Sequence, residues 1–455
     1  MDKGRFSWVY AFFKGLVKFG LNRFYQIRQV HGYDEVPKNV AVMFTPNHQN
    51  ALIDALNAAC GTKLERQPTF LTRADVFVSW AMPVLNAYKM LPVYRQRDGV
   101  DTLAKNEAIF EECIQRLMHN ESLIIFVEGN HAKEFRLRPL KKGAGRIAFQ
   151  AFERSKEQLD LHFVPVGLNY SNHQKVRNEV LINYGPAFPI SDFLESYKQN
   201  PRKGLLKATK AIQASLAEQI IHIENTSHYE TINGLRLVFS KALAKANGDS
   251  PTDLRARFLI EKKVVAQLEN EVKAGGEAME QFHQDAAAYF AWLEEENLRD
   301  HVIASGKYPV GTLLLQGIGF LLGLPVYLFG LLNNYHAYRL ADHLAVSNFK
   351  DLQFHSSIRM VTALLLFPIF YLLQTGLVWI FTNWWIALAY LVALPITGNF
   401  AFWLAQKFKK WRARWRFRSM LNKQDAQALH MAESRKQIFS KLLGMLEPKM
   451  EKVGS

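Results

Sequence analysis

The stretch Val40-Ala-Val-Met-Phe-Thr-Pro-Asn-His-Gln-Asn-Ala-Leu-Ile-Asp54 changes from strand-forming to helix-forming residues. Residues 40–45 are apolar and β-prone, whereas residues 49–60 are rich in helix formers, so His48 is predicted between a strand and a helix. Such junctions commonly hold active sites. A neutral imidazole there can take a proton from an alcohol, and Asp54 can fix its tautomer. The pair suggests acyl transfer without a metal, although a helix-capping histidine beside a surface aspartate would give the same pattern.

Three further segments follow in order: Met90-Leu-Pro-Val-Tyr-Arg-Gln-Arg-Asp-Gly99, Ile124-Ile-Phe-Val-Glu-Gly-Asn-His131 and Phe163-Val-Pro-Val-Gly-Leu-Asn-Tyr170. Together with His48 and Asp54, they resemble the four blocks of the glycerolipid acyltransferase family, which includes the lysophosphatidic acid and glycerol-3-phosphate acyltransferases. The resemblance covers roughly residues 30–190 at the block spacing of the family. It implies an α/β domain with a central mixed sheet flanked by helices, in which His48 is the general base and Asp54 its partner.

The resemblance also implies residues that bind the substrate. Arg95 looks like the arginine that the family carries before its third block, and Glu128 and Gly129 match its Glu-Gly pair. Glu128 follows a buried-looking strand, where a carboxylate can accept loop amides or a substrate hydroxyl, and the resemblance favours the substrate. Gly129 permits a tight turn after that strand.

Fixed cations are needed because glycerol phosphates carry a dianionic head, and the planar arginine fork binds phosphate oxygens in pairs. We expect Arg97 and Lys141 to contribute, with His131 standing where the family has an arginine. Lys141 precedes a helical stretch over residues 146–152, and a helix start favours anions. Basic residues on loops can also be merely solvated.

Two departures from the family pattern bear on activity. Five residues separate His48 from Asp54 where the family usually has four, and one inserted residue turns a helix by about 100°. Histidine replaces arginine at His131. An inactive membrane scaffold or lipid-binding protein is therefore an alternative, but the presence of His48, Arg95 and Glu128 favours an enzyme.

The composition indicates a membrane-associated protein of a reducing compartment. Two cysteines among 455 residues offer no disulfide framework, and a net charge of +15 favours anionic partners such as lipids, acyl-CoA, acyl carrier protein or nucleic acid. Basic and aromatic residues alternate over residues 407–418, directly after a long apolar run. This pattern is typical of a juxtamembrane anchor and argues against nucleic acid.

Three apolar runs, over residues 309–332, 360–381 and 384–404, are each long enough to span a membrane, which needs roughly 20 residues. The second and third read as a tight hairpin whose ends face the cytoplasm by the positive-inside rule. With the catalytic domain also cytoplasmic, the first run must return to the side it entered, and its glycines and Pro325 permit a broken, re-entrant pair of short helices. A full third span is the alternative.

The predicted organisation has five parts: an amphipathic, membrane-contacting helix (1–29), an acyltransferase domain (30–199), a helical soluble region (200–305), membrane segments (306–405) and a basic amphipathic tail (406–455). The N-terminal part is predicted to lie in the membrane interface because aromatic residues alternate there with lysines such as Lys14.

The sequence therefore predicts a membrane-bound O-acyltransferase of phospholipid synthesis without a cofactor or metal. Its donor would be acyl-CoA or acyl carrier protein, and its acceptor lysophosphatidic acid or glycerol 3-phosphate. Another lysolipid or an aminolipid is a further possible acceptor.

Overall fold

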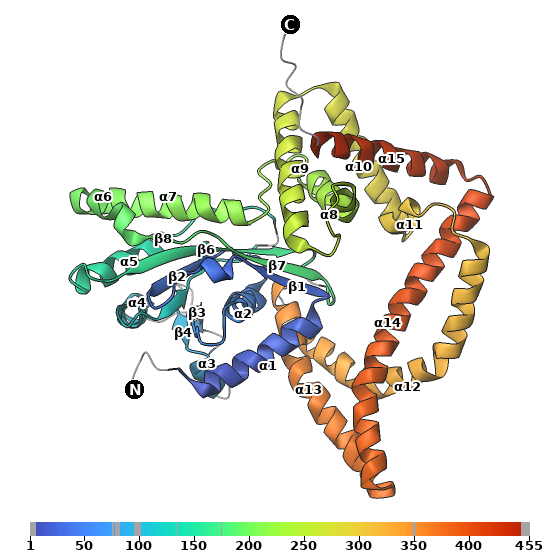
Figure 1. The fold of residues 1–455 in the computed structure, drawn as a ribbon, viewed down its shortest axis with the longest axis horizontal. Helices are drawn as coiled ribbons and strands as arrows, with labels where there is room; N and C mark the ends of the chain where they lie inside the picture. The colour runs from blue at the N-terminus through green and yellow to red at the C-terminus, as the bar shows by residue number, and fades with distance from the viewer. Residues whose placement is uncertain are drawn as a thin grey trace. The chain divides into compact units, whose positions relative to one another are not determined.

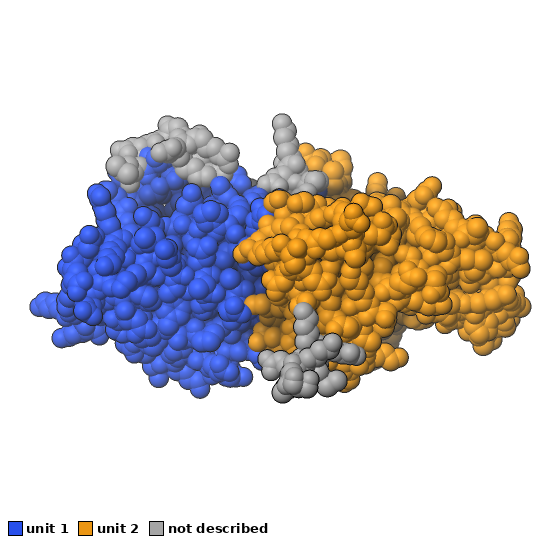
Figure 2. Space-filling view, turned by 90° about the horizontal axis from the view of Figure 1, so that it is seen from above, with its two compact units in different colours: residues 1–222, 351–357 blue, residues 223–350, 358–455 orange. Residues whose placement is uncertain are grey.

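The computed structural model describes residues 6–74, 77, 82–94, 102–132, 134–173, 175–348 and 352–446. The chain forms two compact units. The first comprises Met1–His222 with Asp351–Ser357, and the second comprises Ile223–Lys350 with Ile358–Ser455 (Figure 2). Each unit is described separately below.

The first unit is built on a mixed sheet, and the predicted fold class is confirmed (Figure 1). The described strands lie in the order β1-β7-β6-β2-β5-β3-β4, with β8 paired to β6. Strands β6 and β7 are antiparallel, as are β6 and β8, and the other pairs are parallel. Their bounds are β1 Ile27–His31, β2 Ala41–Pro46, β3 Thr69–Arg73, β4 Met90–Val93, β5 Ser122–Ile124, β6 Leu161–Tyr170, β7 Glu179–Tyr184 and β8 Phe188–Pro189.

Helices cover both faces because successive side chains of the buried strands point to opposite sides. Met43 of β2 joins a hydrophobic cluster with α4 (Thr102–Met118), α5 (Gly143–Arg154) and α7 (Pro201–Gln219). The next residue, Phe44, meets the ring of Tyr184, whose hydroxyl donates to Ala58 of α2 (Ala51–Gly61). Helix α1 (Trp8–Phe24) packs on α2. The first unit also contains two short helices, α3 (Met82–Ala87) and α6 (Leu194–Gln199).

Helix α7 belongs to the first unit, although the sequence placed residues 200–219 in a separate helical region. Its buried side chains Ala208, Ile212 and Leu216 are part of the cluster that covers the sheet. The polar composition of this segment reflects its exposed face, whereas its narrow apolar face packs against the sheet of the first unit.

Helix α1 turns a lysine inward and aromatic rings outward. Lys14 is 1% exposed, and its ammonium donates to Thr62 Oγ1 at 2.7 Å and to the carbonyls of Lys63 and Arg66 at 2.8 Å. Burial lowers the pKa of Lys14 to about 8. Trp8 is 80% and Phe12 68% exposed. The sequence placed Lys14 on a polar outer face, but the loop over residues 62–66 supplies oxygens that stabilise it inside.

Replacing Lys14 by methionine is expected to lower the free energy of unfolding by about 1–3 kcal/mol, because the oxygens around the ammonium lose their donor. Thermal unfolding of the purified protein in detergent measures this change. Lys18→Met is the matched control, since Lys18 lies exposed on the same helix and its replacement should leave the melting temperature almost unchanged. Equal melting temperatures for the two variants would contradict the proposed role of the buried ammonium.

Helices make up the described part of the second unit. Helices α8 (Tyr229–Ala246), α9 (Leu254–Ala274), α10 (Glu277–Glu295) and α11 (Asp300–Ala304) precede the apolar segments, and α15 (Ala426–Leu446) packs on them. Arg435 of α15 forms an ion pair with Asp300 at 2.7 Å, and Phe439 stacks near Phe239 of α8. The tail thus packs against the helices that precede the apolar segments.

Three helices of the described chain are long and apolar enough to cross a membrane, which indicates membrane association. They are α12 (Val310–Asn348), α13 (Leu352–Phe381) and α14 (Trp384–Asn422). The predicted break in the first apolar run is absent from the described residues, because α12 is one helix that contains Pro325 and changes direction along its length (Figure 1).

Two glycines of α12, Gly323 and Gly330, serve close packing instead of a break. A Cβ on Gly330 would lie 2.1 Å from the carbonyl oxygen of Thr397 in α14, and one on Gly323 would lie 3.2 Å from Phe400. Small residues let the backbones of neighbouring membrane helices approach closely. Asn334 of α12 adds hydrogen bonds to this contact, since it donates to the carbonyl of Leu394 and accepts from the hydroxyl of Tyr371.

Candidate active site

The candidate site lies at the carboxyl edge of the parallel strands. Strands β2, β5 and β6 are neighbours that run in the same direction, so the segments that follow them meet at one edge. His48 follows β2, Glu128 follows β5 and Tyr170 ends β6. Ligands of open α/β sheets bind outside this edge.

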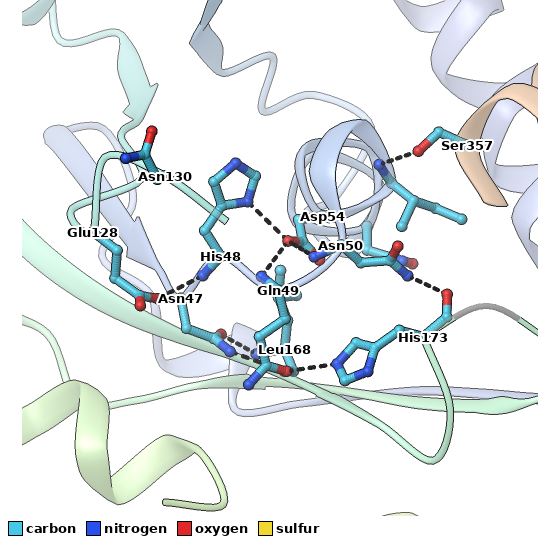
Figure 3. A network of polar contacts seen from close by, with 12 residues as sticks. Asn47, His48, Gln49, Asn50, Asp54, Glu128, Asn130, Leu168, His173 and Ser357 are labelled. Atoms are coloured by element: carbon cyan, nitrogen blue, oxygen red, sulfur yellow. Dashed lines mark hydrogen bonds and ion pairs between the residues drawn. The ribbon is translucent and has the colours of Figure 1, made fainter. Parts of the chain in front are cut away.

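His48 and Asp54 are in direct contact. His48 Nδ1 lies 2.9 Å from Asp54 Oδ2, and the other ring nitrogen, Nε2, points away from the carboxylate (Figure 3). The imidazole stacks on Phe126 with ring centroids 4.1 Å apart. A proton held on Nδ1 by the carboxylate leaves the lone pair on Nε2, which is the arrangement of a general base. The structure therefore brings the two predicted catalytic residues together.

Asp54 is fully buried and is held by donors on both oxygens. Besides His48, Oδ2 accepts the backbone N–H groups of Gln49 at 2.7 Å and Asn50 at 2.6 Å. Oδ1 accepts the hydroxyl of Tyr170 at 2.6 Å. Burial and the neighbouring Asp54 carboxylate hold the pKa of Tyr170 well above its ordinary value, so this phenol remains a donor. These bonds stabilise a charged carboxylate behind the imidazole.

The longer His-to-Asp spacing is accommodated before the regular part of α2. Ala51 has φ of +43°, a left-handed value that is uncommon for a residue with a side chain. Backbone N–H groups of Gln49 and Asn50 fold back onto Asp54 in this turn. The additional residue is thus taken up by a kink instead of rotating Asp54 away from the imidazole.

Glu128 positions the loop of His48. Its Oε1 accepts the backbone N–H of His48 at 2.7 Å, and its Oε2 accepts Nε of Arg138 at 2.9 Å. Both oxygens therefore have protein donors, which supports a positioning role, and the contact with substrate stays a prediction. Gly129 has φ of +75° in the turn that follows, as its backbone role requires.

Four further residues were predicted to bind the substrate: His131 lies beside His48, Lys141 lies beside Gly129, and the other two fall outside the described residues. The ring of His131 lies 5.5 Å from that of His48, and the next residue, Ala132, donates its N–H to the carbonyl of His48. Lys141 donates its backbone N–H to Val127. Arg95 and Arg97 fall outside the described residues.

Three residues of the site were not predicted: Asn47, Phe126 and Tyr170. Asn47 bonds Leu168 reciprocally, donating to its carbonyl at 3.1 Å and accepting its N–H at 2.7 Å, which ties the histidine loop to β6. All three lie in the blocks quoted above, so their position at or just after strand ends could have identified them as site residues from the sequence. Among the described residues, no group of three His, Cys, Asp or Glu is placed to hold a metal ion.

Residues 27–169 match the model of the family described as Acyltransferase. This segment contains the His48–Asp54 pair, so the fold and site define an acyltransferase domain. For this domain, the match confirms the acyltransferase predicted from the four blocks.

Two curated proteins are similar to this chain. Glycerol-3-phosphate O-acyltransferase 1 of Saccharomyces cerevisiae is 23% identical over 219 residues, which cover 46% of this chain and 28% of that protein. An uncharacterized acyltransferase of Schizosaccharomyces pombe is 22% identical over 207 residues, or 44% of this chain and 29% of that protein. The matched segments thus span less than a third of these relatives.

A solved structure, the crystal structure of the 1-acyl-sn-glycerophosphate (LPA) acyltransferase PlsC from Thermotoga maritima, matches with a TM-score of 0.31 and 18% identity. The match covers 45% of this chain and 79% of that chain.

Proposed function

We propose that the protein is a membrane-bound O-acyltransferase that transfers a fatty acyl group from a thioester donor to a hydroxyl of a glycerol phosphate. The observation that carries this proposal is the contact between His48 and the buried Asp54 at the carboxyl edge of the sheet. The donor is acyl-CoA or acyl carrier protein, and the acceptor is lysophosphatidic acid or glycerol 3-phosphate.

The reaction is a direct transfer. Nε2 of His48 removes the proton of the acceptor hydroxyl as its oxygen attacks the thioester carbonyl. The carbon–sulfur bond then breaks, and the imidazolium returns the proton to the departing thiolate. Asp54 stabilises the imidazolium between these two steps. An ester and a free thiol are the products, and no covalent acyl-enzyme forms.

Basic residues that follow the strands of the sheet are proposed to hold the phosphate of the acceptor. Arg95 and Arg97 follow β4, whose carboxyl end lies at the same edge of the sheet as that of β2. His131 and Lys141 belong to the loop region after β5. We assign the phosphate contact to Arg95, since a guanidinium binds two phosphate oxygens at once.

The described site favours activity over an inactive scaffold. A buried carboxylate costs free energy unless it is fully hydrogen-bonded, and here four donors surround Asp54. Two backbone N–H groups and the hydroxyl of Tyr170 fix the position of the carboxylate, so that it can bond the fourth donor, the imidazole of His48. A protein that only bound lipid would have no need of this arrangement.

The test offers purified protein radiolabelled acyl-CoA or acyl carrier protein, with glycerol 3-phosphate or lysophosphatidic acid supplied separately. Product with one acceptor assigns the substrate. Activity only with another lysolipid or with an aminolipid would change the acceptor class. A folded protein that transfers nothing to any of these acceptors would contradict the proposed function.

We propose that the chain enters the membrane from the face that carries the catalytic domain and that its C-terminal tail returns to the same face. The three candidate spans all lie after residue 309, so the described chain before them stays on one face. Residues 351–357 group with the first unit, and α15 packs on α8–α10. We propose that α12, which changes direction along its length, begins and ends on one face, and that α13 and α14 form a hairpin. The basic cluster over residues 407–418 supports a cytoplasmic orientation of that face, by the positive-inside rule.

Cysteine labelling of intact cells tests this path. With Cys60 and Cys113 replaced, Thr382→Cys at the turn between α13 and α14 is expected to react with an impermeant maleimide from outside. Ser347→Cys and Lys423→Cys should react only after permeabilisation. Reaction of Ser347→Cys from outside would mean that α12 crosses the membrane completely.

A further inference from the structure

Helix α2 begins without a cap from its own sequence. The side chain of Asn50, the residue before the helix, makes no capping bond, and its amide Nδ2 donates instead to the carbonyl of His173 at 2.7 Å. The first N–H groups of a helix have no partner within it, and a buried N–H without a partner is costly. This helix carries Asp54 in its first turn, so its start bears directly on the site.

The missing cap comes from a residue 304 positions away. Ser357 Oγ accepts the backbone N–H of Ile53 at 3.1 Å, and Ser357 is fully buried (Figure 3). Ile53 is the third residue of α2, the position whose N–H an N-cap side chain normally receives. Ser357 lies near the start of α13, and both residues belong to the first unit.

Neighbouring residues of the same turn also reach the histidine loop. Ser356 Oγ donates to the carbonyl of His173 at 2.8 Å, the same carbonyl that holds Asn50. The ring of Phe354 lies 5.5 Å from that of His131, which in turn lies 5.5 Å from that of His48. The start of α13 thus contacts Ile53 of α2 and two residues, His173 and His131, that border the histidine loop.

We propose that Ser357 is a positioning residue for the His48–Asp54 pair, supplying from an apolar helix the cap that the kinked start of α2 lacks. The kink at Ala51 permits the five-residue spacing, but an alanine in a left-handed conformation is strained. The hydroxyl of Ser357 holds Ile53, next to Asp54, and so keeps the carboxylate within reach of the imidazole. This inference rests on the proposed acyl transfer.

Ser357→Ala is expected to lower kcat about tenfold, a loss of about 1.4 kcal/mol of transition-state stabilisation, with KM for donor and acceptor within about twofold of wild type. Adding Ala51→Gly should restore part of kcat, because glycine adopts the left-handed turn without strain and needs the cap less. Thr362→Val on the same helix is the matched control, since its hydroxyl bonds only carbonyls of α13. This control should keep the activity of the wild type.

Hydrogen–deuterium exchange gives a second measurement that needs no activity. Amide exchange of residues 49–56 should be faster in Ser357→Ala than in wild type and unchanged in Thr362→Val. Unchanged exchange in Ser357→Ala would show that Ser357 does not cap α2. Faster exchange together with the kcat of the wild type would show that Ser357 stabilises α2 but does not position the catalytic pair. If the wild type transferred no acyl group, the proposed function would fail, and the exchange data alone would decide whether Ser357 caps α2.

Discussion

Replacing His48 by alanine is expected to lower kcat/KM for acyl transfer by about 10²–10⁴, because a positioned general base contributes a factor of this size. The imidazole contacts Asp54 at one nitrogen and presents the other away from it, so alanine removes the base that the carboxylate orients. Initial rates with saturating donor and varied acceptor measure the loss. Binding of the acceptor should change little, since phosphate contacts are assigned to other residues.

The chain offers a matched control for this variant. His162 also forms a His–Asp pair, with Nε2 2.8 Å from Asp160, but it lies at the opposite end of β6 from Tyr170. His162→Ala should therefore retain the activity of the wild type. Equal rates for His48→Ala and the wild type would exclude His48 as the base.

Asp54→Asn is expected to reduce kcat by about a thousandfold or more, because an amide no longer fixes the proton on Nδ1 or stabilises the imidazolium. The change also removes an acceptor where several N–H and O–H donors converge, so we expect a loss of about 1–3 kcal/mol in the free energy of unfolding. Rates and thermal unfolding measured on the same preparation separate the two effects.

Asp160→Asn is the corresponding control, and it should alter neither quantity because Asp160 is largely exposed. Stability loss without a loss of kcat in Asp54→Asn would show that Asp54 is structural and would remove the carboxylate from the proposed mechanism.

The sequence predicted the core of the site because its residues lie beside strand ends. His48 follows a run of apolar, β-prone residues, and Glu128 follows another, so the edge at which they meet could be inferred from alternation and block order. The same reasoning could have included Asn47 and Tyr170, which occupy similar places. Their donors and acceptors became evident only when the partners across the sheet were known.

Other features depend on contacts that no local pattern reveals. Ser357 lies in a segment that reads as the start of a membrane helix, and nothing near it in the sequence points to Ile53. Lysine is a residue type that normally lies at the surface, yet the oxygens of residues 62–66 stabilise Lys14 in the interior. Glycines in an apolar run suggest a break in the helix, whereas Gly323 and Gly330 of α12 are contact points with α14.

The left-handed Ala51 also has a consequence for how such chains are found. Motif patterns describe an active site by a fixed number of residues, but two side chains meet according to the path of the backbone between them. One kinked residue here restores the contact that a regular helix would lose. A search that allows four or five residues between the histidine and the aspartate will therefore retrieve enzymes that a strict pattern discards.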